Sequence, residues 1–89
     1  MAGDIGLAIK AIKNKAKLSR EEWDGDYIVL LPGYPEGILA NENNQKAHKV
    51  PAGTIMYYKP YIQKFTAQGI VMWAPTAEDI LADDWVILE

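Results

Sequence analysis

The chain has 89 residues, of which 49% are hydrophobic and 24% charged, and a formal net charge of −3. This length predicts one domain, and the composition is typical of a folded protein rather than a disordered one. The absence of cysteine and the single histidine, His48, exclude disulfides, thiolate chemistry and a histidine-rich metal site within one copy.

Further partners and compartments are disfavoured by the distribution of charge and apolar residues. No apolar run approaches the roughly 20 residues that a membrane span needs, and the N-terminus lacks the features of a signal peptide. The negative net charge argues against a nucleic-acid polymer, because neutralising phosphates needs a basic surface. We therefore expect a protein that stays in the cytoplasm where it is made, with neither a membrane nor a nucleic acid as partner.

The first predicted element is a helix over residues 4–16. Its apolar residues recur at spacings of three and four, and so share one face: Ile5, Ala8, Ile9, Ile12 and Ala16. Asp4 suits the N-cap position, and the lysines gather near the C-terminal end, where the helix dipole favours them. We interpret these lysines as a solvated face rather than a binding strip.

A turn and a strand are predicted next. Trp23, Asp24 and Gly25 have turn chemistry, since Asp and Gly tolerate unusual backbone angles. Residues 27–31 form an apolar, β-prone run that ends at Pro32. Its lack of alternation indicates burial on both faces, or on one face against a partner subunit.

Residues 32–53 show no clear periodicity and are interrupted by proline, glycine and asparagine. We interpret this segment as a long loop insertion, which is uncommon in a compact domain. Two alternatives stay open. Tyr34 and residues 41–45 could line or cover a binding site, or the segment could be a mobile surface excursion.

The remaining predicted elements are short. Residues 54–58 and 61–65 form two strands, and the turn chemistry of 66–69 reverses the chain into a strand over 70–73. Pro75 stops that strand, Thr76 caps a short helix with Asp79 in its first turn, and residues 85–88 form the last strand. The predicted fold is α+β, an N-terminal helix packed on a small antiparallel sheet of about five strands.

Three motifs resemble a known family. They are Arg20-Glu21-Glu22-Trp23-Asp24-Gly25, Trp73-Ala74-Pro75-Thr76 and Asp79-Ile80-Leu81-Ala82-Asp83-Asp84-Trp85. The arrangement resembles the second type of Thoeris anti-defence protein, a small phage-borne family. The similarity covers residues 5–31 and 61–88, and the closing motif is its most specific part.

The resemblance implies a non-enzymatic protein without a cofactor. Members of that family bind the nucleotide signals of bacterial TIR-domain immune enzymes, cyclic ADP-ribose isomers with a glycosidic ring closure. They keep these signals from the effector in the cytoplasm of the infected bacterium. Cyclic dinucleotides are a second ligand class of the family, bound at a separate site. The resemblance also implies a homo-oligomer, typically a tetramer, with ligand pockets between subunits.

A cyclic nucleotide needs a flat surface for its base, donors for its phosphates and polar groups for its riboses. Trp23 and Trp73 lie beside turns and are the candidate stacking residues, whereas Trp85 lies within an apolar strand and is expected in the core. Arg20 suits bidentate phosphate contacts. The complete set of candidate ligand-binding residues is Arg20, Trp23, Asp24, Gly25, Tyr34, Trp73, Pro75, Thr76 and Asp79.

Individual members of this set have more than one interpretation. Thr76 and the amides after Pro75 offer N–H donors at a helix N-terminus, although Glu78 and Asp79 would repel a phosphate there. Asp24 or Asp79 would suit ribose hydroxyls or an adenine amino group. They equally suit a turn and a helix cap, and for Asp79 we favour the cap.

Two other functions remain open. Asp83-Asp84 and Glu78-Asp79 could hold Mg²⁺ for phosphodiester hydrolysis, but adjacent residues on a strand point to opposite faces. No catalytic residue or metal ligand is therefore predicted. An adaptor that binds other proteins through Tyr57, Tyr58 and Tyr61 is the other alternative, and the same tyrosines would suit a contact between copies.

Overall fold

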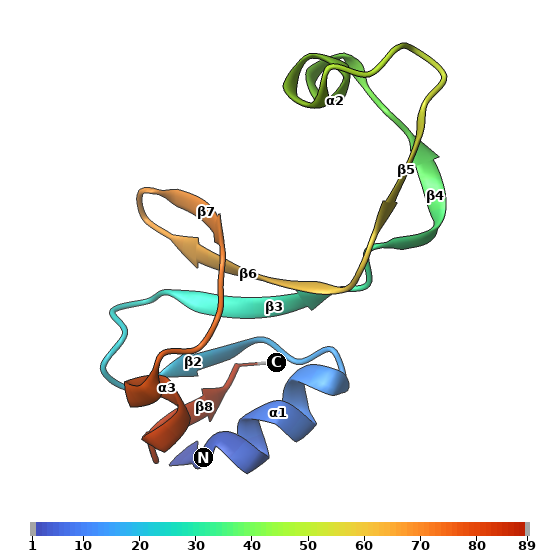
Figure 1. Cartoon of the computed structure of the whole chain (residues 1–89). Helices are drawn as coiled ribbons and strands as arrows, with labels where there is room; N and C mark the ends of the chain where they lie inside the picture. Colours follow the sequence, from blue (N-terminus) through green and yellow to red (C-terminus); the bar gives the residue numbers. More distant parts are fainter. Residues whose placement is uncertain (1, 89) are drawn as a thin grey trace.

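The predicted N-terminal helix is present as α1 (Ile5–Lys13) in the computed structural model, which describes residues 2–88 (Figure 1). Met1 and Glu89 lie outside the described residues. Asp4 is the N-cap, as predicted, and its side chain accepts a hydrogen bond of 3.0 Å from the Leu7 amide. The helix ends before the predicted residue 16, because Lys15 takes a left-handed conformation with φ 70°.

The helix packs against an antiparallel sheet of six strands, a little larger than predicted. The sheet order is β1-β8-β2-β3-β6-β7. The strands are β1 (Ala2–Gly3), β2 (Leu18–Arg20), β3 (Tyr27–Leu31), β6 (Tyr61–Thr66), β7 (Gly69–Met72) and β8 (Trp85–Ile87). The predicted strands over 27–31, 61–65, 70–73 and 85–88 are confirmed, with small shifts at their ends. The two additional strands, β1 and β2, contain only two and three residues.

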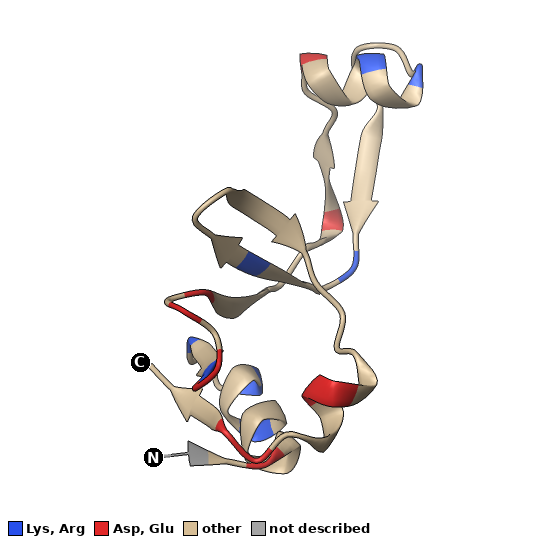
Figure 2. Ribbon diagram, turned by 90° about the vertical axis from the view of Figure 1, so that its left-hand side faces the viewer, with Lys and Arg blue, Asp and Glu red and all other residues tan. Residues whose placement is uncertain are grey.

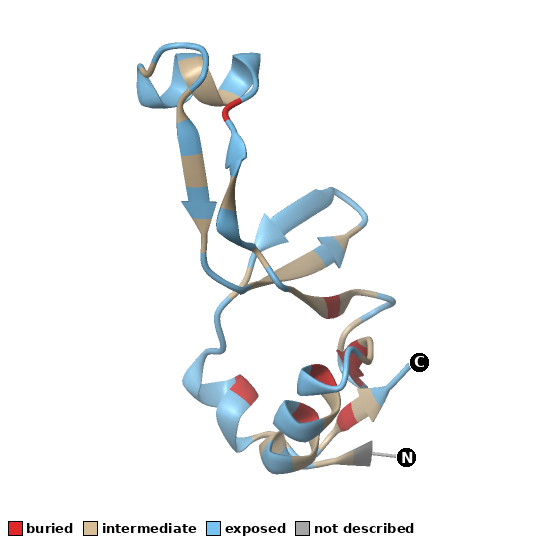
Figure 3. Ribbon diagram, turned by 90° about the vertical axis from the view of Figure 1, so that its right-hand side faces the viewer, coloured by how far each residue is buried: buried red, intermediate tan, exposed pale blue. Residues whose placement is uncertain are grey.

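The core lies between α1 and the half of the sheet nearest the termini. Its buried apolar residues come from α1, β2, β3 and β8: Ala8, Ile12, Leu18, Ile28 and Trp85. Trp85 is fully buried, which confirms its predicted place in the core. Figure 3 shows most of the buried positions gathered in this part of the molecule.

The interpretation of residues 32–53 as a loop is wrong. This segment contains β4 (Tyr34–Leu39) and α2 (Glu42–His48), and β4 pairs with β5 (Ile55–Tyr58) in a separate two-stranded antiparallel sheet. We call β4, α2 and β5 together the arm. Gly33 lies at its base with φ 70°, where a Cβ would clash with the carbonyl oxygens of Tyr58 and Lys59. The arm's entry therefore requires glycine.

The arm extends away from the rest of the protein (Figure 1). Among the described elements, β4 and β5 make their contacts with each other. The radius of gyration is 15.8 Å, compared with about 12 Å expected for a compact domain of this length. None of the described helices is long and apolar enough to cross a membrane.

Candidate functional site

Three tryptophans from distant parts of the sequence meet at one place. Trp23 follows β2, Trp73 follows β7, and Trp85 begins β8. The ring centroids lie 5.4 Å apart for Trp23 and Trp85, and 6.1 Å apart for each pair that includes Trp73. The three planes are inclined to one another by 77–82°, so every contact is edge-to-face. Trp23 and Trp73 remain half-buried.

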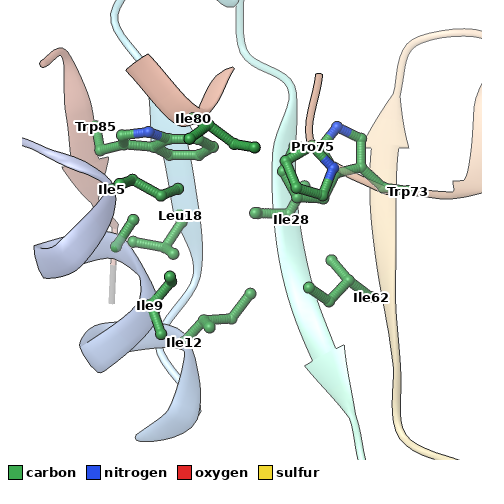
Figure 4. A pocket seen from close by; sticks show the side chains of 11 residues that line it. Ile5, Ile9, Ile12, Leu18, Ile28, Ile62, Trp73, Pro75, Ile80 and Trp85 are labelled. Atoms are coloured by element: carbon green, nitrogen blue, oxygen red, sulfur yellow. The ribbon is translucent and has the colours of Figure 1, made fainter. Parts of the chain in front are cut away.

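An apolar cleft of about 310 Å³ opens beside this cluster, between α1, the sheet and the segment that leads into α3 (Ala77–Leu81). Figure 4 shows its two walls facing each other across the opening. The lining residues are Ile5, Ala8, Ile9, Ile12, Leu18, Ile28, Ile62, Trp73, Pro75, Ile80 and Trp85. Because none of these side chains except tryptophan has a polar atom, the cleft suits a flat or apolar group rather than a charged one.

Arg20, the only arginine in the sequence, lies in β2 opposite Trp85 of β8. Its side chain is 5% exposed and is surrounded by carboxylates. Its Nε donates to Asp84 Oδ1 at 2.8 Å, and its two terminal nitrogens donate to Asp79 at 2.9 Å and Glu22 at 3.0 Å. Glu78 lies 3.6 Å from the same guanidinium. In one copy, the predicted phosphate-binding group is therefore engaged with carboxylates of its own chain.

These contacts favour the charged forms of Arg20, Asp79 and Asp84. The hydrogen bond to Asp84 raises the pKa of Arg20 well above its ordinary value, although burial opposes this, and Asp79 adds to the rise. The hydrogen bond from Arg20 lowers the pKa of Asp84. Burial acts to raise the pKa of Asp79, but hydrogen bonds from Thr76 and Arg20 outweigh it, so the pKa of Asp79 is lowered.

Asp79 also fixes helix α3 in place. Its carboxylate accepts hydrogen bonds from the Thr76 amide at 2.9 Å and hydroxyl at 3.0 Å, and its own amide donates to the Thr76 hydroxyl. This is a capping box, which confirms the predicted cap. The Asp79 carbonyl accepts a hydrogen bond of 3.0 Å from the Trp85 indole. Helix α3 is thus joined to both the arginine and the tryptophan cluster.

The structure brings most of the candidate ligand-binding residues together. Direct contacts link Arg20 to Asp79, Asp79 to Thr76, and Trp23 to Trp73, while Pro75 lies beside Trp73 in the cleft wall. The last two candidates of this region, Asp24 and Gly25, form the exposed turn after Trp23; Gly25 has φ 87°.

Tyr34 is the exception. It begins β4 in the arm, where its ring contacts Tyr58 edge-to-face at 5.8 Å. It lines a second hollow of about 110 Å³ at the base of the arm, together with Leu31, Pro32, Gly33 and Tyr61. Within one copy, Tyr34 is therefore not part of the tryptophan site.

Lys64 also lies beside the site, although the sequence did not predict it as a site residue. Its ammonium lies 4.1 Å from the centre of the Trp23 ring and 4.0 Å from Asp26. A cation over the face of a tryptophan is a favourable contact. The pairing of Tyr27 with Phe65 fixes the register of β3 and β6 that places Lys64 here, and only a correct pairing of these strands could have identified it.

Acidic residues dominate the surface around Arg20. Figure 2 shows them on the turn after β2, on α3 and on the turn before β8. Among the described residues, no group of three or more histidine, cysteine or acidic side chains is arranged to hold a metal ion. Asp84, which the alternative of a magnesium site would use as a ligand, instead accepts a hydrogen bond from Arg20.

Comparison with known protein families finds a match over nearly the whole chain. A sequence model of the Tad2-like family, described as the Thoeris anti-defense 2-like domain, matches residues 3–88. The match spans the arm as well as the two ends of the chain on which the resemblance was based. No curated protein matches the sequence.

Proposed function

The chain belongs to the Tad2-like family, and on that premise we propose that it is a phage immune-evasion protein that binds and sequesters a cyclic nucleotide signal. The signal is a cyclic ADP-ribose isomer made by the TIR-domain enzyme of a Thoeris defence system, with cyclic dinucleotides as a second ligand class. The protein acts in the cytoplasm of the infected bacterium without changing the ligand chemically. The family match over residues 3–88 is the observation on which this proposal rests.

The geometry of the tryptophan cluster supports a base-binding role. Stacking of a nucleobase on an aromatic side chain is worth about 1–3 kcal/mol. Trp23 and Trp73 are half-buried and held by edge-to-face contacts, so their orientations are set before a ligand arrives. Such preorganisation lowers the entropic cost of binding.

The phosphates of the ligand require hydrogen-bond donors, and the donors of Arg20 beside the tryptophan cluster are already engaged. Arg20 is engaged with carboxylates, and Glu22, Glu78 and Asp84 surround it, so a phosphate would meet negative charge there. Lys64, whose ammonium lies 4.1 Å from the centre of the Trp23 ring, is a cation at the cluster that could meet a phosphate. We therefore propose that the pocket is completed by a second copy, with the homo-oligomer, a tetramer, as the binding species.

The arm supports self-association. A two-stranded hairpin alone is marginally stable in water. Its exposed apolar side chains are Tyr34, Ile38, Leu39, Ile55 and Tyr57, and Tyr57 is 69% exposed. Because no other described element of the same copy contacts β4 or β5, contact with a second copy would stabilise the arm and bring Tyr34 to a site on another subunit.

Retention of intact ligand tests this proposal. The protein is incubated with candidate cyclic nucleotides, free ligand is removed, the protein is denatured, and the released compound is identified. Release of the unaltered nucleotide supports sequestration. A chemically altered product would indicate an enzyme, and the absence of any bound nucleotide would favour the adaptor alternative. Trp73→Ala should reduce the retained amount, whereas Lys13→Ala at the exposed C-terminal end of α1 should not.

A further inference from the structure

Strand β7 is an open edge of the six-stranded sheet. It is the last strand in the order β1-β8-β2-β3-β6-β7, and it pairs only with β6 among the described strands. All four of its residues, Gly69–Met72, are exposed. An unpaired edge presents a row of free backbone donors and acceptors that can pair with another chain.

The register shows which backbone groups are free. The Trp73 amide donates to the Ile62 carbonyl at 2.9 Å, so the backbone N–H and C=O groups of Trp73 face β6. Hydrogen-bonded and non-hydrogen-bonded residue pairs alternate along an antiparallel ladder. The backbone N–H and C=O groups of Val71 and Gly69 therefore also face β6. The N–H and C=O groups of Ile70 and Met72 therefore point out from the edge.

β7 has no charged residue, no proline and no bulge to protect its open edge. Proteins commonly blunt such edges with charged residues, proline or a bulge. The sequence Gly69-Ile70-Val71-Met72 has no charge and no proline, and its pairing with β6 is regular. Ile70, Val71 and Met72 are 59%, 51% and 68% exposed. Figure 2 shows the strand without charge, next to the single basic position on β6.

We propose that β7 pairs antiparallel with β7 of a second copy, about a twofold axis that passes between the Val71 residues of the two copies. This register places Ile70 opposite Met72 of the other copy, and Met72 opposite Ile70. The outward groups of both residues then meet, and four backbone hydrogen bonds form across the axis. The pairing is self-complementary, as a twofold interface requires, and it joins the two sheets into one.

Side chains agree with this register. Ile70 and Met72 point to the same face as Phe65, because Ile70 is paired with Phe65 on β6 and residues two apart share a face. Pairing thus places apolar side chains opposite each other and buries part of their exposed surface. No like charges meet directly, because β7 is uncharged. This contact would be a second interface of the proposed homo-oligomer, and it requires neither the nucleotide nor the arm.

Cysteine cross-linking tests the register, since the chain has no cysteine of its own. Val71→Cys places two thiols opposite each other in a non-hydrogen-bonded pair, with Cα atoms about 4.5 Å apart, within the range of a disulfide. Ile70→Cys is the matched control. In the proposed register its thiol lies opposite Met72 of the other copy, two positions away from that copy's own thiol. We expect Val71→Cys to form the disulfide dimer roughly ten times faster or more, because pairing raises the local thiol concentration. Equal rates, or no dimer from either variant, would overturn the proposal.

Amide hydrogen exchange of the unmodified chain gives an independent readout. The Ile70 and Met72 amides have no partner in the ladder with β6, so they should exchange quickly if the edge is open. The proposed pairing protects both amides to the same degree as Val71, and dilution should remove this protection. Fast exchange of Ile70 and Met72 at high protein concentration would contradict it.

Discussion

At the scale of single residues, Arg20 determines how the candidate site is held together. Its guanidinium joins a strand, a turn and a helix through Glu22, Asp79 and Asp84, which are separated from it by up to 64 positions. A planar guanidinium with several N–H donors can bind three carboxylates at once, which the single ammonium group of lysine cannot do. In one copy, Arg20 therefore positions the tryptophan site through the elements it joins.

Acid should destabilise the protein through these carboxylates. The pKa values of Asp79 and Asp84 are lower in the folded chain than their unfolded value of about 3.9. Their stabilising contribution is therefore complete above the unfolded pKa and is lost as the pH falls through the folded pKa values. We expect the free energy of unfolding to fall steadily from about pH 5 downward. Denaturant titration at several pH values measures this, and Asp84→Asn should flatten the dependence.

Replacing Arg20 should cost stability more than replacing an exposed cation. Arg20→Ala leaves the buried Asp79 carboxylate unpaired, and breaking a buried pair in this way costs about 3–5 kcal/mol. Arg20→Lys keeps the charge but cannot reach three acids at once, so an intermediate loss is expected. Lys46→Ala is the control, because its pair with Glu42 is exposed. A loss for Arg20→Ala equal to that control would contradict the structural role.

The three tryptophans should respond differently to truncation. Trp85 is fully buried, so Trp85→Ala should lower the free energy of unfolding by about 3–5 kcal/mol. Trp73→Ala should cost less stability, because Trp73 is half-buried, but should weaken ligand binding more. Thermal unfolding and ligand titration on the same samples separate the two effects. Equal binding by Trp73→Ala and the unmodified protein would exclude Trp73 as a stacking residue.

At the scale of elements, the short helix α3 depends on its cap. With only five residues, it has little helical stability of its own. Thr76→Ala removes the side-chain half of the capping box and should cost about 1 kcal/mol. Thr76→Ser keeps the hydroxyl and should stay close to the unmodified protein. Denaturant unfolding of both variants provides the comparison, and a similar loss for serine would show that the cap is not the cause.

Elements with a buried face could be predicted from the sequence, and elements without one could not. Helix α1 and strands β3, β6 and β8 show apolar patterns because they bury residues against one another. Helix α2 buries none of its residues, so its sequence, ENNQKAH, has no apolar periodicity. Its N-cap, Asn41, was the one signal available. β4 contains a proline and a glycine, which are uncommon in strands and therefore favoured the prediction of a loop.

The candidate site was predictable as a set of residue types and not as an arrangement. Turn chemistry identified Trp23 and Trp73, and the burial of Trp85 followed from its apolar strand. The contact between Trp23 and Trp73 spans fifty positions, so only the strand order reveals it. The partners of Arg20 were equally hidden, because β2 has only three residues and no clear strand pattern.

At the scale of the whole molecule, two apolar regions of one copy are left exposed by the described residues. The arm extends from the body with its apolar residues exposed, and an apolar cleft of about 310 Å³ remains open (Figures 1 and 4). We expect Leu39→Glu with Tyr57→Glu to lower the oligomeric state, because charge would replace apolar contact on the arm. Sedimentation at several concentrations measures this change. An oligomer of unchanged size would exclude the arm as a contact between copies.

The most direct test of sequestration measures the signal itself. A fixed amount of the cyclic ADP-ribose signal is mixed with increasing amounts of the protein, and the activity of a Thoeris effector is recorded before and after the protein is denatured by heat. If the protein sequesters the signal, activity falls in proportion to the number of binding sites and returns after denaturation, because the ligand is released intact. Activity that never falls, or that falls and does not return, would contradict the account.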